Sequence, residues 1–259
     1  MGVSEYLRET AERMRLETRI QKTRTLHINS ANRSFSFETF DNDASFAQAK
    51  ATLQGQTYPP IPFLTDVVSV LDIGANIGAS AVTFAIRYPG ARIVAVEPSR
   101  LASILLRCNT SAHANIECYN VGLFHTTMKR QLYLGGSDSV TNSVVQNALS
   151  SPLQEEIQLL AADAFAAEVG VTHPDIIKID TEGCELPIIS SMVDSFRGAK
   201  AVYLEYHSES DRLAIDKALT DTHILFFGRI PFPHRGELVY VRKDAFPTLK
   251  ERDLWRIGN

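Results

Sequence analysis

The feature that most constrains the fold is a strand that runs directly into a glycine-containing turn. A mostly apolar run of strand length begins at Val67 and ends in an acid, Asp72, and a turn carrying Gly74, Asn76 and Gly78 follows at once. Glycines let a ligand approach the backbone closely, and the helix expected behind the turn offers unpaired N–H groups. The stretch therefore predicts a βα turn that binds a nucleotide.

Strand-like and helix-like segments alternate after this turn. Strands are expected at residues 92–97, 116–121, 157–160, 175–180, 201–207, 223–227 and 237–242, with helices at 79–88, after Ser99, after Asp163, around Pro187 and at 211–219. This order is typical of right-handed crossovers, so we expect an α/β fold with a doubly wound, mostly parallel sheet. Residues 129–134 and 143–146 predict a hairpin, and the loop between them is either a lid or an exposed insertion without a role.

Three prolines, Pro59, Pro60 and Pro62, interrupt regular structure before the turn. They divide the chain into a cap segment, residues 1–65, and a main domain, residues 66–259. In the cap segment we expect an amphipathic helix within residues 1–24, short strands at 26–29 and 34–38, and a helix at 44–53. The first helix could cap the active site, join two subunits of a homodimer or pack on the flank of the domain.

Composition restricts the class of partner. The 259 residues are 44% hydrophobic and carry a net charge of −4, which gives no reason to expect a nucleic-acid surface or a membrane-binding face. No apolar stretch has spanning length and the N-terminus is charged, so a cytoplasmic protein acting on small molecules is expected. The three cysteines, Cys108, Cys118 and Cys184, lack CxxC spacing, which predicts reduced thiols rather than a zinc site or disulfides.

Polar and acidic groups occupy the carboxyl ends of the expected strands. Ligands bind at these ends in an open doubly wound sheet, so one crevice is expected to gather residues 72–78, 97–99, 120–122, 180–182 and 205–207. Lys178, inside a buried strand, needs a partner, and Asp180 or Glu205 is the simplest choice. Asp180, Glu182 and Glu205 could alternatively gather a divalent cation, which spacing does not decide, and no metal site is assigned.

The turn also indicates which nucleotide binds. Dinucleotide enzymes use G-x-G-x-x-G, whereas this chain has D-x-G-x-N-x-G with Asn76 where a second glycine would stand. This departure argues against NAD. The acid Glu97 at the end of the next strand suits a ribose diol in either class of cofactor.

Three segments resemble one family, the FkbM-type methyltransferases, which use S-adenosylmethionine. The resemblance is carried by Leu-Asp-Ile-Gly-Ala-Asn-Ile-Gly at residues 71–78, Val-Glu-Pro at 96–98 and Ile-Lys-Ile-Asp-Thr-Glu-Gly-Cys-Glu at 177–185, and it covers roughly residues 58–242. It implies a class I methyltransferase sheet, Rossmann-like, whose last two strands form an antiparallel edge. Cys184 stands where the family usually has a small residue, often alanine.

The resemblance also implies roles for residues. The glycine turn with Asp72 would hold the methionine part of S-adenosylmethionine, and Glu97 would accept hydrogen bonds from both ribose hydroxyls. Asn120, Val121 and Gly122 would line the adenine side. The full set expected to bind the cofactor is Asp72, Gly74, Asn76, Gly78, Glu97, Ser99, Asn120, Val121, Gly122 and Asp180. Family members methylate hydroxyl groups, so the implied reaction is O-methylation of a small metabolite or sugar.

Methyl transfer to a hydroxyl needs a base that removes its proton. His207 is the first candidate because its ordinary pKa suits neutral pH, and Glu182 and Asp180 follow. Two other functions remain open: a nicotinamide-dependent oxidoreductase on the same architecture, and a cofactor-binding partner protein without catalysis. Specificity for the acceptor is expected in the cap segment and in the loop at residues 135–143.

Overall fold

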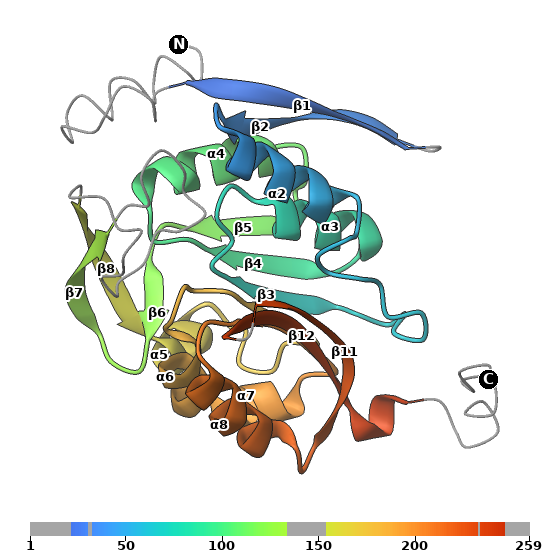
Figure 1. Ribbon diagram of the computed structural model, residues 1–259, viewed down its shortest axis with the longest axis vertical. Helices are drawn as coiled ribbons and strands as arrows, with labels where there is room; N and C mark the ends of the chain where they lie inside the picture. Colours follow the sequence, from blue (N-terminus) through green and yellow to red (C-terminus); the bar gives the residue numbers. More distant parts are fainter. Residues whose placement is uncertain (1–21, 31–32, 134–153, 233, 247–259) are drawn as a thin grey trace.

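The computed structural model describes residues 22–30, 33–133, 154–232 and 234–246. Its main sheet has seven strands in the order β11-β12-β10-β9-β3-β4-β5 (Figure 1). Their bounds are β3 (Ser69–Ile73), β4 (Arg92–Val96), β5 (Ile116–Tyr119), β9 (Ile176–Ile179), β10 (Ala201–Tyr206), β11 (His223–Phe232) and β12 (Arg235–Arg242). The doubly wound, mostly parallel sheet is therefore confirmed, and its order reverses between β3 and β9.

The predicted antiparallel edge is the β11–β12 pair. The last strand, β12, lies between β10 and β11 and is antiparallel to both, so β11 forms the outer edge. This is the strand arrangement expected for a class I methyltransferase sheet.

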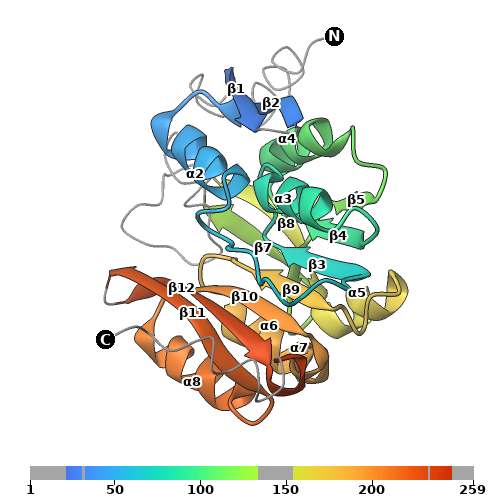
Figure 2. The ribbon, with the colours of Figure 1, turned by 90° about the vertical axis from the view of Figure 1, so that its right-hand side faces the viewer.

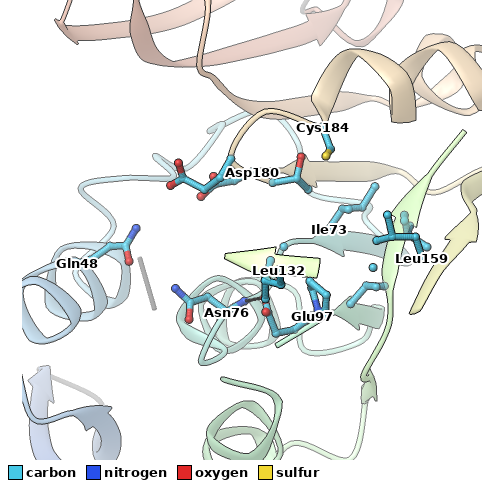
Figure 3. Close-up of a pocket in the computed structure, with 15 residues that line it drawn as sticks. Gln48, Ile73, Asn76, Glu97, Leu132, Leu159, Asp180 and Cys184 are labelled. Atoms are coloured by element: carbon cyan, nitrogen blue, oxygen red, sulfur yellow. Dashed lines mark hydrogen bonds between the residues drawn. The ribbon is translucent and has the colours of Figure 1, made fainter. Parts of the chain in front are cut away.

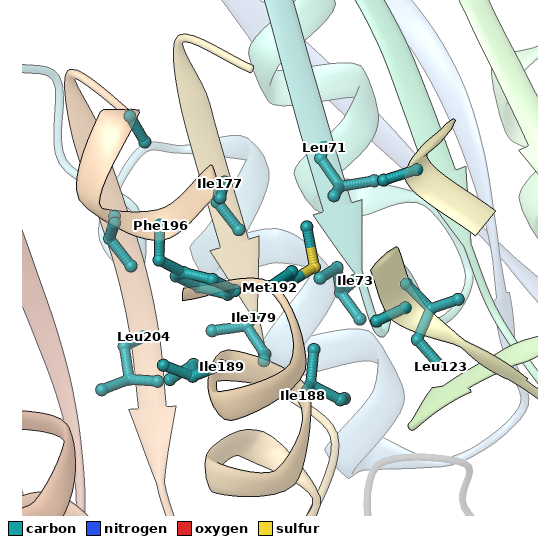
Figure 4. Close-up of a cluster of buried hydrophobic side chains, with 14 of the residues drawn as sticks. Leu71, Ile73, Leu123, Ile177, Ile179, Ile188, Ile189, Met192, Phe196 and Leu204 are labelled. Atoms are coloured by element: carbon teal, nitrogen blue, oxygen red, sulfur yellow. The ribbon is translucent and has the colours of Figure 1, made fainter. Parts of the chain in front are cut away.

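Helices cover both faces of this sheet, as Figures 1 and 2 show. One face carries α3 (Ala79–Arg87) and α4 (Arg100–Thr110), and the other carries α5 (Ala162–Glu168), α6 (Glu185–Ser191), α7 (Val193–Gly198) and α8 (Glu209–Leu219). Because successive strand residues point to opposite faces, β3 and β9 contribute to both cores. Leu71 and Ile177 pack with the α6 residue Ile188 and the α7 residue Phe196 (Figure 4), whereas Val70 packs with α3.

The cap segment consists of β1 (Thr23–Ser30), β2 (Arg33–Phe40) and α2 (Asp43–Leu53), which confirms the two short strands and the helix expected there. Apolar residues of the β1–β2 hairpin, including Leu26 and Phe37, share a buried cluster with Leu105 of α4. Asn109 of α4 fastens the hairpin by bonding both the N–H and the C=O of Glu38, at 2.7 and 2.9 Å. The first expected helix falls largely outside the described residues, and the division at residue 65 stays a prediction.

A second, three-stranded sheet stands beside the main one, in the order β6-β8-β7. It contains β6 (Gly122–Phe124), β7 (Met128–Tyr133) and β8 (Gln154–Ala161), so the strand expected at residues 157–160 belongs to β8 and not to the main sheet. The first arm of the expected hairpin is β7, whose antiparallel partner is β8. The other expected arm and the candidate lid lie outside the described residues. Within the part of the chain described here, none of the helices is both long enough and apolar enough to span a membrane.

Candidate functional site

The β3–α3 turn is held between two neighbouring strands. The N–H groups of Gly74 and Ala75 both donate to the carbonyl of Val96 at the end of β4, at 3.0 and 2.9 Å. On the other side, the backbone N–H of Asp180 donates to the carbonyl of Ile73. Gly74 has a φ of +76°, and a Cβ added there would lie 1.8 Å from the carbonyl oxygen of Asp180. This position therefore requires glycine because of both its conformation and its close neighbour.

Replacing Gly74 with alanine is expected to lower the free energy of unfolding by about 2–5 kcal/mol, because a left-handed backbone and an overpacked contact are both imposed. Denaturant unfolding of Gly74→Ala measures this loss. The matched control is Gly90→Ala, where a Cβ would meet open space and the change should stay within about 0.5 kcal/mol. Equal stability of the two variants would contradict the close approach of Gly74 to the carbonyl oxygen of Asp180.

Glu97 is the acid that the turn surrounds. Its side chain is 7% exposed, and its two carboxylate oxygens accept hydrogen bonds from the backbone N–H groups of Asn76 at 2.9 Å and Ser99 at 2.8 Å. Burial raises the pKa of Glu97 to about 7, although these two hydrogen bonds oppose the rise. Asn76, whose N–H is one of the two donors, adopts a φ of +49°, a left-handed conformation that asparagine tolerates.

Lys178 and Asp72 form an ion pair beneath the turn. Their charged atoms lie 3.3 Å apart, and both side chains are almost fully buried. Lys178 also donates to the carbonyl of Gly74, and the hydroxyl of Ser80 donates to Asp72 at 2.6 Å. The expectation that Lys178 pairs with Asp180 or Glu205 was therefore wrong. Lys178 and Asp72 are direct neighbours in the parallel register of β3 and β9.

A cleft opens at the carboxyl ends of β3, β4 and β9, where the strand order reverses (Figure 3). It encloses about 670 Å³ of empty space, including its open mouth. Five of the residues expected to bind the cofactor line it: Gly74, Asn76, Glu97, Gly122 and Asp180. The predicted crevice is thus present, and the turn, Glu97 and the fourth parallel strand, β9, meet in it.

The remaining residues of that set are not among those that line the cleft. Gly78 packs against α4, since a Cβ there would come within 2.9 Å of Leu106, and Asp72 lies in the ion pair described above. Ser99 caps α4 and donates to Glu97, while the side-chain amide of Asn120 donates to the carbonyl of Glu97 at 2.9 Å. Val121 packs on the apolar core. These residues support the site through contacts with its neighbours, and direct contact between them and a ligand stays a prediction.

Several residues of the cleft were not expected from the sequence. Gln48 comes from α2, Leu132 from β7 and Leu159 from β8, three elements outside the regular alternation. The alternation of Ile157 and Leu159 with polar residues is the sequence signal that could have indicated that Leu159 points inward, as the burial pattern of β8 has it. Cys184 also lines the cleft, where burial raises the pKa of its thiol to about 12 and keeps it neutral.

The three predicted catalytic residues lie close together, but not in equivalent places. Asp180 and Glu182 line the cleft, whereas His207 lies against Glu182 at 3.2 Å and Glu185 at 3.3 Å. Burial lowers the pKa of His207, but hydrogen bonds and charges from Glu182 and Glu185 outweigh it and raise the pKa to about 11. His207 is therefore protonated at neutral pH. This corrects the expectation that His207 is the first-choice base.

Arg235 adds a second cation to this cluster. It binds Glu205 at 2.5 Å and Glu182 at 3.0 Å, from the start of β12. Burial, followed by the charge of Asp180, raises the pKa of Glu205 to about 8, even though Arg235 opposes this. The acids at the ends of β9 and β10 are thus balanced largely by His207 and Arg235.

Three possible metal ligands lie near one another in this cluster. A carboxylate oxygen of Asp180, one of Glu185 and a ring nitrogen of His207 all lie within 4.8 Å of one another, close enough to hold a metal ion. Glu185 already accepts hydrogen bonds from the backbone N–H groups of Thr181 at 2.8 Å and Gly183 at 3.1 Å. Because His207 is also protonated, these groups are engaged with one another, and we assign them to shaping the Asp180–Glu185 turn.

The proton on His207 should make its contribution to stability depend on pH. Since the pKa is raised from 6.5 to about 11, the stabilisation is complete below about pH 6.5 and is lost as the pH rises toward 11. Urea unfolding should therefore show that His207→Gln is more destabilising at pH 7 than at pH 10. His173→Gln, at an exposed histidine, is the control. A difference between wild type and His207→Gln that stays constant with pH would contradict the assigned charge.

Comparison with known proteins adds independent findings. A family model described as the Methyltransferase FkbM domain matches residues 72–228. A curated relative, the AMB antimetabolite synthetase AmbE of Pseudomonas aeruginosa, is 25% identical over 213 residues, which are 68% of this chain and 10% of the synthetase. The chain therefore spans about a tenth of the length of that relative.

Solved structures of similar shape are also found. A precorrin-6Y C5,15-methyltransferase from Geobacter metallireducens has a TM-score of 0.43 and 14% identity, with 79% of this chain and 93% of the other covered. The fibrillarin pre-rRNA processing protein of Methanococcus jannaschii has a TM-score of 0.48 and 11% identity, over 84% and 82% of the two chains. A ribosomal protein L11 methylase from Lactobacillus delbrueckii subsp. bulgaricus has a TM-score of 0.44 and 14% identity, over 79% and 81%.

Proposed function

The chain belongs to the FkbM family of methyltransferases, and from this premise we propose that it transfers a methyl group from S-adenosylmethionine to a hydroxyl group of a small metabolite or sugar. Family membership decides against the nicotinamide-dependent oxidoreductase that the sheet alone left open. The proposal has three parts: the binding of S-adenosylmethionine, the class of methyl acceptor, and the transfer of the methyl group to an oxygen atom of that acceptor.

The observation that carries the proposal is the position of Glu97. A buried carboxylate at the end of β4 lines the cleft and is held in place by two backbone N–H groups. An ionised carboxylate has about four acceptor positions, so two remain for the hydroxyl groups of a ribose. Beside it, Leu123, Leu132 and Leu159 provide an apolar surface suited to adenine. The residues present therefore fit an adenosine group.

S-adenosylmethionine, when bound, supplies a methyl group on an excellent leaving group, which leaves the protein to align the acceptor and remove its proton. Asp180 is the base that we assign. It lines the main cleft and also a second cavity beside the turn, so it faces the region between them. Glu182 shares its charge with His207 and Arg235, and we assign it to binding the acceptor.

The acceptor class follows from the groups near Asp180. Glu182 in the cleft, with Arg235 and Glu205 behind it, offers hydrogen-bond donors and acceptors of both charges, which suit a polyhydroxylated molecule. The similarity to part of an antimetabolite synthetase supports a role in making small molecules.

Incubation of the protein with S-adenosylmethionine labelled in its methyl group and a panel of sugars and hydroxylated metabolites tests this function. The expected result is label on a hydroxyl oxygen of at least one acceptor, with S-adenosylhomocysteine formed in equal amount. Label found only on nitrogen would refute O-methylation. Binding of S-adenosylhomocysteine without turnover on any acceptor would favour a partner protein without catalysis.

A further inference from the structure

A second cavity adjoins the main cleft and connects it to the cap segment. It encloses about 360 Å³ and shares Gln48, Gly74, Asn76 and Asp180 with the cleft. Its outer wall comes from the cap segment, through Gln48, Ala49 and Thr52 of α2 and through Tyr58. The cap segment thus faces the β3–α3 turn, beside which the cofactor is proposed to bind.

The main cleft and the second cavity differ in the chemistry of the residues that line them. The main cleft is apolar at the end formed by Leu123, Leu132 and Leu159. The second cavity is polar, with Ser80, Lys178 and Asp180 among its lining residues. If the ribose binds Glu97 and the adenine takes the apolar end, the amino-acid end of the cofactor must point to the polar cavity.

Tyr58 is fixed in this cavity by contacts on two sides. Its backbone carbonyl accepts a hydrogen bond from Arg87 at 2.8 Å, and the carbonyl of Pro59 accepts one from the hydroxyl of Tyr203 at 2.9 Å. The ring of Tyr58 packs edge-on against Tyr203, with centroids 5.9 Å apart. Burial, reinforced by the charge of Asp180, raises the pKa of Tyr58, so its hydroxyl keeps its proton and can donate.

Gln48, on α2, lines both cavities. Figure 3 shows its amide directed toward the space between Asn76 and Asp180. The helix that carries it is anchored at its N-terminus, where Asn42 accepts from the N–H of Ser45 at 2.7 Å. At its other end, the hydroxyl of Thr83 in α3 donates to the carbonyl of Thr52 at 3.2 Å.

The charges around the cavity match a zwitterion. An amide and a phenol each donate and accept, so Gln48 and Tyr58 can bind either a carboxylate or an ammonium group. Ala79 and Ser80, in the first turn of α3, line the cavity, and the helix cap Gly78 provides no side-chain acceptor for their N–H groups. A carboxylate is favoured at such a helix start. The charge of Lys178 on the same wall is already balanced by Asp72, so the helix start, Gln48 and Tyr58 are the groups left to bind the ligand.

We propose that Gln48 and Tyr58 bind the amino-acid end of S-adenosylmethionine and S-adenosylhomocysteine, so that the cap segment forms part of the cofactor site. This inference rests on the proposed function, because it assumes an adenosine group held by Glu97. It assigns to α2 and the Tyr58 loop a ligand contact that lies N-terminal to the matched family region.

Calorimetry with two ligands tests the inference. S-adenosylhomocysteine carries the amino-acid end, whereas 5′-methylthioadenosine has the same adenosine and sulfur without it. Gln48→Ala and Tyr58→Phe are each expected to weaken S-adenosylhomocysteine about 3–10-fold, the effect of one lost hydrogen bond, and to leave 5′-methylthioadenosine within about twofold. The affinity of the second ligand is measured directly or by displacement of the first. Lys50→Ala, an exposed change on the same helix, should affect neither.

Equal weakening of both ligands, or no weakening of S-adenosylhomocysteine, would overturn the inference while leaving the proposed function in place. Glu97→Gln separates the two claims, because it should weaken both ligands together. A wild-type protein that binds neither ligand would overturn the proposed function and this inference with it.

Discussion

Replacement of Asp180 by asparagine is expected to lower turnover by about 10²–10⁴-fold, the usual contribution of a positioned general base. The amide keeps the size of the side chain but cannot take a proton from the acceptor hydroxyl. Asp180 also lines the cavity proposed to hold the amino-acid end of the cofactor, so its loss should weaken S-adenosylhomocysteine by about 3–10-fold, the effect of one hydrogen bond, while kcat falls far more. Steady-state kinetics and calorimetry on the same preparation separate the two quantities.

Two further variants make this result specific. Asp221→Asn changes an exposed aspartate between α8 and β11 and should leave turnover unchanged. Glu182→Gln should raise the KM for the acceptor more than it lowers kcat, if Glu182 binds the acceptor. Full turnover in Asp180→Asn with loss of turnover in Glu182→Gln would move the base to Glu182.

Replacement of Glu97 by glutamine is expected to weaken S-adenosylhomocysteine by about 10²–10⁴-fold. Each charge-assisted hydrogen bond is worth about 1.5–3 kcal/mol, two ribose hydroxyls are involved, and about 1.4 kcal/mol corresponds to a tenfold change. Calorimetry measures the change. Glu155→Gln is the control for a buried acid, because Glu155 binds the N–H of Arg100 at 3.1 Å without lining the cleft. Its charge raises the pKa of Glu97, so its removal should not weaken binding. Unchanged affinity in Glu97→Gln would mean that the ribose binds elsewhere.

The same residue gives the binding a pH dependence. Since burial raises the pKa of Glu97 to about 7, the carboxylate loses a proton in the neutral range and gains acceptor capacity as the pH rises. Affinity of the wild type for S-adenosylhomocysteine should therefore increase from about pH 6 to about pH 8. In Glu97→Gln this increase should be absent. An increase of the same size in both proteins would assign it to another group.

The sheet and its ligand-binding edge could be predicted because their signals are local. The apolar run before Asp72, the glycine turn and the cap at Ser99 each determine nearby backbone, and the order of strands and helices then places the carboxyl ends together. Glu97 was identified from its position at a strand end, and the structure places it in the cleft.

Other features depend on contacts between distant segments and left no local signal. The pairing of Lys178 with Asp72 follows from two strands being neighbours, which the order in the chain does not reveal. Residues 180–182 and 205–207 were expected to gather, but the direct contacts of His207 with Glu182 and Glu185, which raise its pKa, were not. Gln48 reaches the cleft only because α2 packs against α3, a contact that helical periodicity alone cannot predict.

Titration of the purified chain with S-adenosylhomocysteine, with NAD in parallel, tests the central claim most directly. The account predicts stoichiometric binding of S-adenosylhomocysteine in the micromolar range, loss of that binding in Glu97→Gln, and no heat from NAD. Binding of NAD without binding of S-adenosylhomocysteine would contradict it.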